Sequence, residues 1–291
     1  MRGWSANPWG KPRFLILYTV LYLVWSIVPI LIAIRFSFNN GRSRSTAQGW
    51  SLRWYTGDPD LSVLHDPELS SALMQSLRLA AIAVLVTVPL GLALAVGLTR
   101  WRGRGAGTSR GIAFATLVTP EIVMGTALLL VFIHLLTFIP LGTTAQAIGH
   151  ITFSLVFVIL IVRGRLLAIG PEYEEAARDL GASRLQALRL ALLPMLVPAI
   201  VASAIIVFAI SMDDFVISAF LSSGTSTDTV PVRIYATGRT APTPALNALA
   251  TLTLALTIVI AAVGFLLWRG VRAARGQSGS TVGEFAATEG L

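Results

Sequence analysis

The stretch PEYEEAARDLGASRLQALRLALLP, Pro171–Pro194, is a charged segment between two apolar ones. Its opening proline suits the first turn of a helix, and the glutamates that follow suit the positive end of the helix dipole. Gly181 is expected to end this helix, because glycine readily adopts the left-handed conformation that follows a last turn. Ser183 with Gln186 three residues later forms a capping box, which begins a second helix. The stretch therefore predicts a helix, a tight turn and another helix that the final proline ends.

The composition indicates an integral membrane protein. Of its 291 residues 55% are hydrophobic and 12% are charged, and the mean hydropathy is +0.75. An ordinary soluble domain has about 25% charged residues. The length suffices for about six spans of ~20 residues, with no sizeable soluble domain. The absence of cysteine from the sequence excludes disulfides, thiol catalysis and cysteine-ligated metals.

Apolar stretches mark the expected spans. The third is interrupted by Thr119-Pro120, where proline removes a helical hydrogen bond and a kink is expected. A cleaved signal peptide is the alternative for the first, but its apolar run is longer than a signal core, and no small-residue cleavage site follows. The six spans predicted are residues 14–34, 79–98, 111–139, 145–162, 195–221 and 245–268.

The segments between the spans are read as loops. Residues 35–75 form a polar external loop, with a short helix expected over 69–75 before the second span, and 222–244 form a second external loop. The tail, 269–291, begins with arginines and then becomes rich in Gly, Ser, Ala and Thr, which predicts disorder.

The distribution of basic residues predicts the orientation. Leaving aside Arg78 at the edge of the second span, 15 Lys and Arg lie on the side of the termini and 6 on the other. Because basic residues concentrate in cytoplasmic segments, residues 1–13, the loop 163–194 and the tail are expected in the cytoplasm. The net charge of +8 is thereby explained by contact with anionic lipid, without nucleic acid.

The central stretch resembles the EAA motif in the membrane subunits of bacterial ABC importers. The spacing is the same, although Ala191 stands where the family usually has isoleucine. In that family the loop is the coupling helix, which docks in a cleft of a separate ATP-hydrolysing subunit. The resemblance thus implies an all-α membrane protein with the type I importer permease (MetI-like) fold. The matching positions are Glu175, Ala176, Ala177, Gly181, Leu193 and Pro194.

Two simpler interpretations of this loop exist. A charged helix pair is often only a solvated interfacial segment, and a basic helix-turn-helix can bind DNA. The location between two spans favours coupling. The phosphate-binding motif G-x-x-x-x-G-K-[ST] does not occur in the sequence, so ATP and Mg are expected on a partner and no cofactor on this chain.

Three acidic residues, Glu121, Asp213 and Asp214, lie inside apolar spans. A carboxylate near the bilayer centre costs on the order of 3 kcal/mol, so such groups are expected to face the bundle interior or a polar cavity. They are candidates for the translocation pathway. The alternative is a position at a helix end or at the membrane interface.

A second resemblance indicates the cargo. Pro120-Glu121-Ile122-Val123, Ser211–Phe215 and Asn247–Thr251 are similar to segments of the spermidine/putrescine permeases of ABC importers. That similarity implies a second, sister permease chain, two ATPase subunits and an extracytoplasmic binding protein, in a bacterial inner membrane. Carboxylates together with the aromatic face of Phe215 suit an ammonium chain.

Other functions are kept open. The same machinery can carry another small solute or a metal ion. A membrane-embedded enzyme using Glu121, His134, Asp213 or Asp214 would leave the EAA loop unexplained, and a channel would need a filter loop that is not evident. The three histidines are scattered without ligand spacing, so no metal site is predicted. We expect a transport subunit and not an enzyme.

Overall fold

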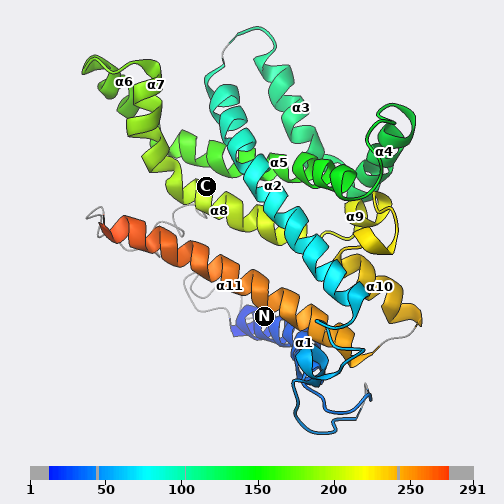
Figure 1. Cartoon of the computed structure of the whole chain (residues 1–291). Coiled ribbons are helices and arrows are strands. Elements are labelled where there is room, and N and C mark those ends of the chain that lie inside the picture. The colour runs from blue at the N-terminus through cyan, green and yellow to red at the C-terminus, as the bar shows by residue number, and fades with distance from the viewer. Residues whose placement is uncertain (1–12, 44–45, 102, 241–242, 275–291) are drawn as a thin grey trace, which may run out of the picture. The chain divides into compact units, whose positions relative to one another are not determined.

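The computed structural model describes residues 13–43, 46–101, 103–240 and 243–274 (Figure 1). Across these ranges the regular elements are all helices, with one isolated bridge pair, Asn39 and Trp50. The chain divides into two compact units, Met1–Asp66 with Gly238–Thr251 and Pro67–Thr237 with Leu252–Leu291. The predictions for residues 1–12 and for the tail from 275 lie outside the described residues.

The first unit contains α1, Arg13–Ser37, which includes the predicted first span. Its large apolar side chains are exposed over most of its length. A helix that is apolar all round is typical of a membrane span, where lipid takes the place of a protein core.

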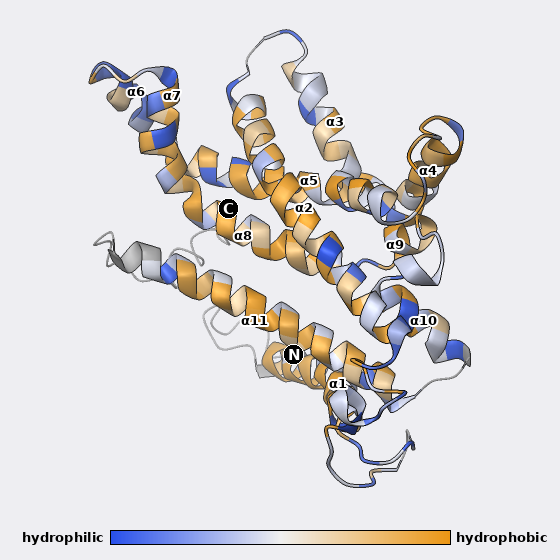
Figure 2. Ribbon diagram, viewed as in Figure 1, coloured by the Kyte–Doolittle hydropathy of each residue, from blue (hydrophilic) through white to orange (hydrophobic). Residues whose placement is uncertain are grey.

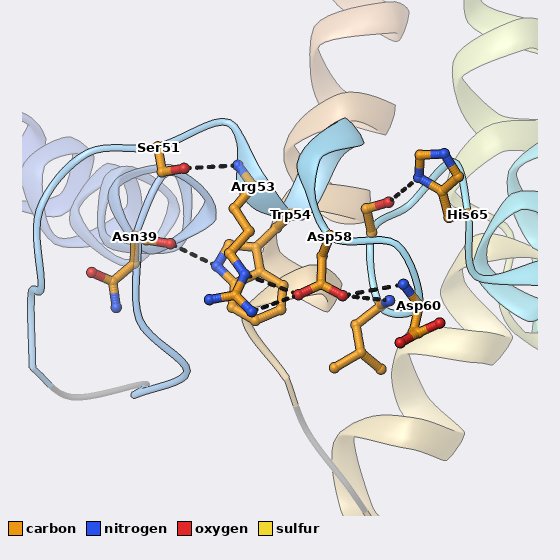
Figure 3. Close-up of polar contacts among 9 residues, drawn as sticks. Asn39, Ser51, Arg53, Trp54, Asp58, Asp60 and His65 are labelled. Atoms are coloured by element: carbon orange, nitrogen blue, oxygen red, sulfur yellow. Dashed lines mark hydrogen bonds and ion pairs between the residues drawn. The ribbon is translucent and has the colours of Figure 1, made fainter.

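The connection after α1 is ordered by its own polar contacts (Figure 3). The Trp54 indole donates a hydrogen bond to the Asn39 backbone carbonyl at 2.6 Å, and Trp54 is fully buried. A short π-helix, Arg53–Gly57, precedes Asp58, whose carboxylate pairs with the Arg53 guanidinium at 2.7 Å. The hydrogen bonds from Arg53 hold the pKa of Asp58 below its ordinary value. The sequence indicated only a polar loop here.

The core of the second unit is formed by three helices packed together: α2, Pro67–Arg100; α5, Thr143–Ile169; and α8, Leu193–Asp213. Gly91 makes the α2–α5 approach possible, because a Cβ atom there would lie 2.6 Å from the Val158 Cβ. The shared core includes Ala83, Val88, Ala95, Val158, Val162, Leu196, Ala199 and Val207.

Residues 69–75 are helical, as expected, but they do not form a short helix of their own. Those residues lie within the first three turns of α2, which is continuous for 34 residues. The sequence between them and the predicted second span contains no glycine or proline, so nothing there interrupts the helix.

The predicted kink of the third span is a sharp turn. The segment forms two helices, α3, Ala106–Val118, and α4, Glu121–His134, bent by 109°. Thr119 is extended, at ψ 123°, as expected for a residue before proline. Among the described residues five helices are long and apolar enough to cross a membrane, or six if this bent pair counts as one span.

The predicted fifth span is also broken. The helix α8 ends at Asp213, and a short helix, α9, Val216–Phe220, follows after a break at Asp214 and Phe215. Sequence analysis missed this break because the segment contains no proline or glycine from Ala199 to Leu221.

The segment expected as a second external loop contains helical structure. After a 3₁₀ turn, Thr225–Thr227, comes α10, Val230–Thr240. A proline in its first turn suits a helix start, and the buried Arg233 forms an ion pair with Glu68 on α2. The last helix, α11, is Pro244–Ala274.

Candidate functional site

The charged stretch at the centre of the sequence begins with α6, Glu172–Asp179. Gly181 has φ +91°, and its N–H donates to the Arg178 carbonyl at 2.9 Å. The Ala182 N–H donates to the Ala177 carbonyl at 3.1 Å, which completes a Schellman motif. The predicted helix end at Gly181 is confirmed.

The second helix begins as the sequence predicts and ends elsewhere. Ser183 and Gln186 form both hydrogen bonds of the capping box at the start of α7, Arg184–Gln186. A π-helical turn, Ala187–Leu192, then leads directly into α8. The expectation that Pro194 ends this helix is wrong, since Pro194 lies in the first turn of α8, where no intrahelical donor is needed.

The loop presents a mixed surface. Leu180, at the turn, is 91% exposed, and every residue of α6 is exposed or half-buried. Polar colours gather on α6 and α7, whereas α1 and α11 are mostly apolar (Figure 2). The helix α6 packs on Ala187–Leu192, and its Glu174 forms an ion pair with Arg100 at the end of α2. An open depression of about 490 Å³ is lined by Glu175, Arg178, Asp179, Gly181, Ala182, Ser183 and Gln186.

The residues of the motif divide into two groups. Glu175, Ala176 and Gly181 are exposed, and Glu175 and Gly181 line the depression. Ala177 is half-buried. Leu193 and Pro194 are half-buried at the start of α8 and do not line the depression.

The three acidic residues predicted inside spans come together at helix ends. Glu121 is the first residue of α4, Asp213 is the last of α8, and Asp214 lies in the break between α8 and α9. Glu121 interacts electrostatically with both aspartates, and its side chain is within hydrogen-bonding reach of Asp214. Asp214 is buried, Glu121 is half-buried and Asp213 is exposed. We call these three residues the acidic group.

An aromatic pair adjoins this group. Phe215 follows Asp214 directly, and its ring lies 4.9 Å from the ring of Tyr235 on α10, centroid to centroid. Carboxylates and aromatic rings are the two kinds of group that attract organic cations.

Sequence reasoning missed a buried polar chain beside the acidic group. His150 on α5 is buried, and its Nδ1 lies 2.7 Å from the Ser211 hydroxyl oxygen. Its Nε2 lies 3.0 Å from the Ser218 hydroxyl oxygen and 3.6 Å from the nearer carboxylate oxygen of Asp214. The Ser218 backbone N–H donates to that same carboxylate oxygen at 2.8 Å.

One turn earlier on α5, Gln146 extends the chain. Its amide nitrogen donates to the carbonyls of Ser218, at 2.9 Å, and Thr227, at 3.0 Å, and its oxygen accepts from Gln75 at 2.8 Å. The sequence signal is the spacing of Gln146 and His150, four residues apart on one face of a mostly apolar helix. Across the described part of the chain, no three His, Cys, Asp or Glu side chains are grouped to hold a metal ion.

Comparison with known proteins identifies the family. Residues 87–273 match the family of the binding-protein-dependent transport system inner membrane component. The chain belongs to this family. It is therefore a permease subunit of the inner membrane, which transports and does not itself catalyse a covalent reaction.

Relatives of the permease support the resemblance seen in the sequence. The putrescine transport system permease protein PotI of Escherichia coli (strain K12) is 36% identical over 269 residues, 90% of each chain. The spermidine/putrescine transport system permease protein PotC of the same strain is 36% identical over 253 residues, 87% of this chain and 91% of the relative.

Solved structures support the fold of the permease. A bacterial ABC transporter involved in the import of the acidic polysaccharide alginate has a TM-score of 0.72 at 16% identity, covering 89% of this chain and 95% of that one. The MetNI methionine ABC transporter has a TM-score of 0.56 at 22% identity, covering 70% and 95%. The predicted all-helical, MetI-like importer permease fold is confirmed.

Proposed function

We propose that this permease forms part of the translocation pathway of an ATP-driven importer for polyamines such as putrescine and spermidine. The observation that carries the proposal is the acidic group, Glu121, Asp213 and Asp214, assembled from two helices that are far apart in the sequence. The names of the 36% identical relatives agree with it.

The chemistry of the acidic group suits a cationic cargo. Carboxylates placed close together repel one another in a medium of low dielectric constant, and a cation between them removes that repulsion. An extended diammonium or triammonium chain also needs replacements for part of its water. Asp213, which is exposed, and the Phe215–Tyr235 pair supply groups of the required kinds next to the buried Asp214.

The exposed α6–α7 loop supplies the proposed link to energy. We assign Glu175, Ala176, Ala177 and Gly181 to contact with a separate ATPase subunit, with Leu193 and Pro194 joining the loop to α8. Two ATPase subunits bind ATP and Mg, a sister permease chain completes the pathway, and an extracytoplasmic binding protein delivers the cargo. The excess of basic residues supports a cytoplasmic position for both termini and for this loop.

Uptake by the whole importer tests this function. Vesicles that contain the permease with its ATPase, sister chain and binding protein are given ATP and labelled putrescine. We expect uptake that excess unlabelled putrescine or spermidine abolishes and that amino acids, sugars or divalent metal ions leave unchanged. Absence of labelled putrescine uptake, with ATP-dependent uptake of one of those other solutes when it carries the label, would assign another cargo to the same transport machinery.

A further inference from the structure

We propose that His150 is a positioning residue for the pathway: it holds the Asp214 carboxylate in place by linking α5 to both helices that flank the break. This inference rests on the proposed function, because it gives His150 a role through Asp214. His150 touches the end of α8 through Ser211 and α9 through Ser218.

The break between α8 and α9 explains why such a link is needed. Two residues, Asp214 and Phe215, lie outside both helices, so backbone hydrogen bonds of a continuous helix are missing there. Asp214 compensates in part, since its carboxylate accepts the Ser218 N–H. A connection with fewer backbone hydrogen bonds would let the carboxylate move unless another element fixed it.

The helix α5 is suited to fix it. It packs against α2, α8 and α9, and its own core residues are buried. Two side chains on one face of α5 bind across the break region: His150 binds Ser211 and Ser218, and Gln146 binds the Ser218 carbonyl. The Ser218 residue is thus held through its side chain and its backbone at once.

An imidazole matches the hydrogen-bonding groups around it, the hydroxyls of Ser211 and Ser218. Neutral histidine has one donor nitrogen and one acceptor nitrogen, and both ring nitrogens of His150 have a serine hydroxyl within 3.0 Å. With the proton on Nε2, His150 donates to Ser218, whose hydroxyl hydrogen bonds to Asp214, and accepts from Ser211. The chain of bonds therefore ends on the carboxylate.

The test uses the complete importer in proteoliposomes, with putrescine uptake at saturating binding protein as the main readout. His150→Phe keeps a ring of similar size and removes both hydrogen bonds. We expect it to slow uptake about tenfold, which lies within the net contribution of two hydrogen bonds, with unchanged co-purification of the ATPase subunit. His150→Gln, which can donate and accept, is expected to restore most of the rate. His134→Phe is the control, because His134 is exposed at the end of α4.

A double variant separates positioning from simple packing. If His150 acts through Asp214, His150→Phe should add no further loss in an Asp214→Asn background. Multiplied losses, or wild-type uptake by His150→Phe alone, would overturn this inference and leave the proposed function standing. Wild-type uptake by Asp214→Asn alone would overturn the assignment of Asp214 to the pathway, and with it the inference.

Discussion

The α6–α7 loop and the buried polar chain around His150 are built in opposite ways. The hydrogen bonds that shape the loop join close neighbours, as between Gly181 and Arg178 or between Ser183 and Gln186. Apart from the bonds of Ser218 to Asp214, the hydrogen bonds of the buried chain join residues 61 to 81 positions apart, on different elements. The loop leaves its side chains exposed, whereas His150 is 1% exposed.

This difference teaches what each region can do. A loop whose turn and helix start are formed by hydrogen bonds between close neighbours can present a defined surface to a partner, with the Arg100–Glu174 ion pair as its polar link to α2. A buried chain holds its shape only while α2, α5, α8 and α9 keep their packing, so it responds to any rearrangement of those helices. The exposed loop is therefore specified by neighbouring residues, whereas the buried chain is specified by residues far apart in the sequence.

The largest effect is expected in the loop, at the turn. Gly181→Pro removes the N–H that closes the turn and requires a φ near −65°, whereas Gly181 has φ +91°. We expect the permease to insert normally and the importer to lose substrate-stimulated ATP hydrolysis, by about 100-fold or more, because the proposed coupling surface is lost. ATP hydrolysis by the purified complex measures this.

Gly181→Asn is the matched control, since asparagine tolerates the left-handed conformation and the space around Gly181 is open. It should retain most of the stimulation. Normal stimulation of ATP hydrolysis in the Gly181→Pro complex would show that the loop is not the coupling surface.

A smaller effect is expected in the acidic group. Asp213→Asn removes one charge from an exposed position and preserves the side-chain shape. We expect putrescine uptake to fall about fivefold, corresponding to roughly 1 kcal/mol, while assembly with the ATPase is unchanged. Rates of uptake and yields of co-purified ATPase are compared in one preparation. Equal loss of both would assign Asp213 a structural role.

The packing that the buried chain depends on can be tested directly. Gly91→Ala places a methyl group 2.6 Å from the Val158 Cβ, so α2 and α5 must separate. Overpacking of this kind destabilises by about 1 to 3 kcal/mol, and a lower thermal midpoint in detergent is expected. Val158→Ala combined with Gly91→Ala should restore part of the lost thermal stability. A thermal midpoint unchanged by Gly91→Ala would mean that α2 and α5 are not closely packed at Gly91.

The smallest effect concerns pH and the loop after α1. The pKa of Asp58 in the folded protein lies below its ordinary value of 3.8, chiefly because Arg53 donates hydrogen bonds to it. The stabilisation is therefore complete above that ordinary value and is lost as the pH falls through the folded-state pKa. Hydrogen exchange of residues 53–66, corrected for intrinsic rates, should rise only when the pH falls below the ordinary value of 3.8.

In Asp58→Asn the same exchange should already be raised at neutral pH and should depend less on pH. Exchange that rises equally in both proteins as the pH falls would assign the effect to another group.

The two regions also differ in how far the sequence predicted them. The helix end at Gly181 and the capping box at Ser183 depend on neighbouring residues, so local rules sufficed. The acidic residues were identified by their cost in a membrane, but their meeting depends on the 109° bend after Val118 and on the break at Asp214. A proline signalled the first of these, as a kink only, and no local residue signalled the second.

The remaining differences have the same origin. The continuation of α7 through Pro194 depends on the π-helical turn before it, and α10 is held by the ion pair of Arg233 with Glu68. His150 and Gln146 were visible only as polar residues at one helical spacing. Their partners on α8 and α9 are set by packing, which a single sequence does not specify.

The π-helical turn, Ala187–Leu192, joins the exposed loop to the helix that ends at Asp213. A π turn holds one residue more than an α turn. Converting this π turn to an α turn would shift α8 by one residue, which rotates the helix by about 100° and moves it by about 1.5 Å along its axis. Ser211 and Asp213 would then face new neighbours. A change of winding beside the loop would thus alter the contacts at the far end of the helix.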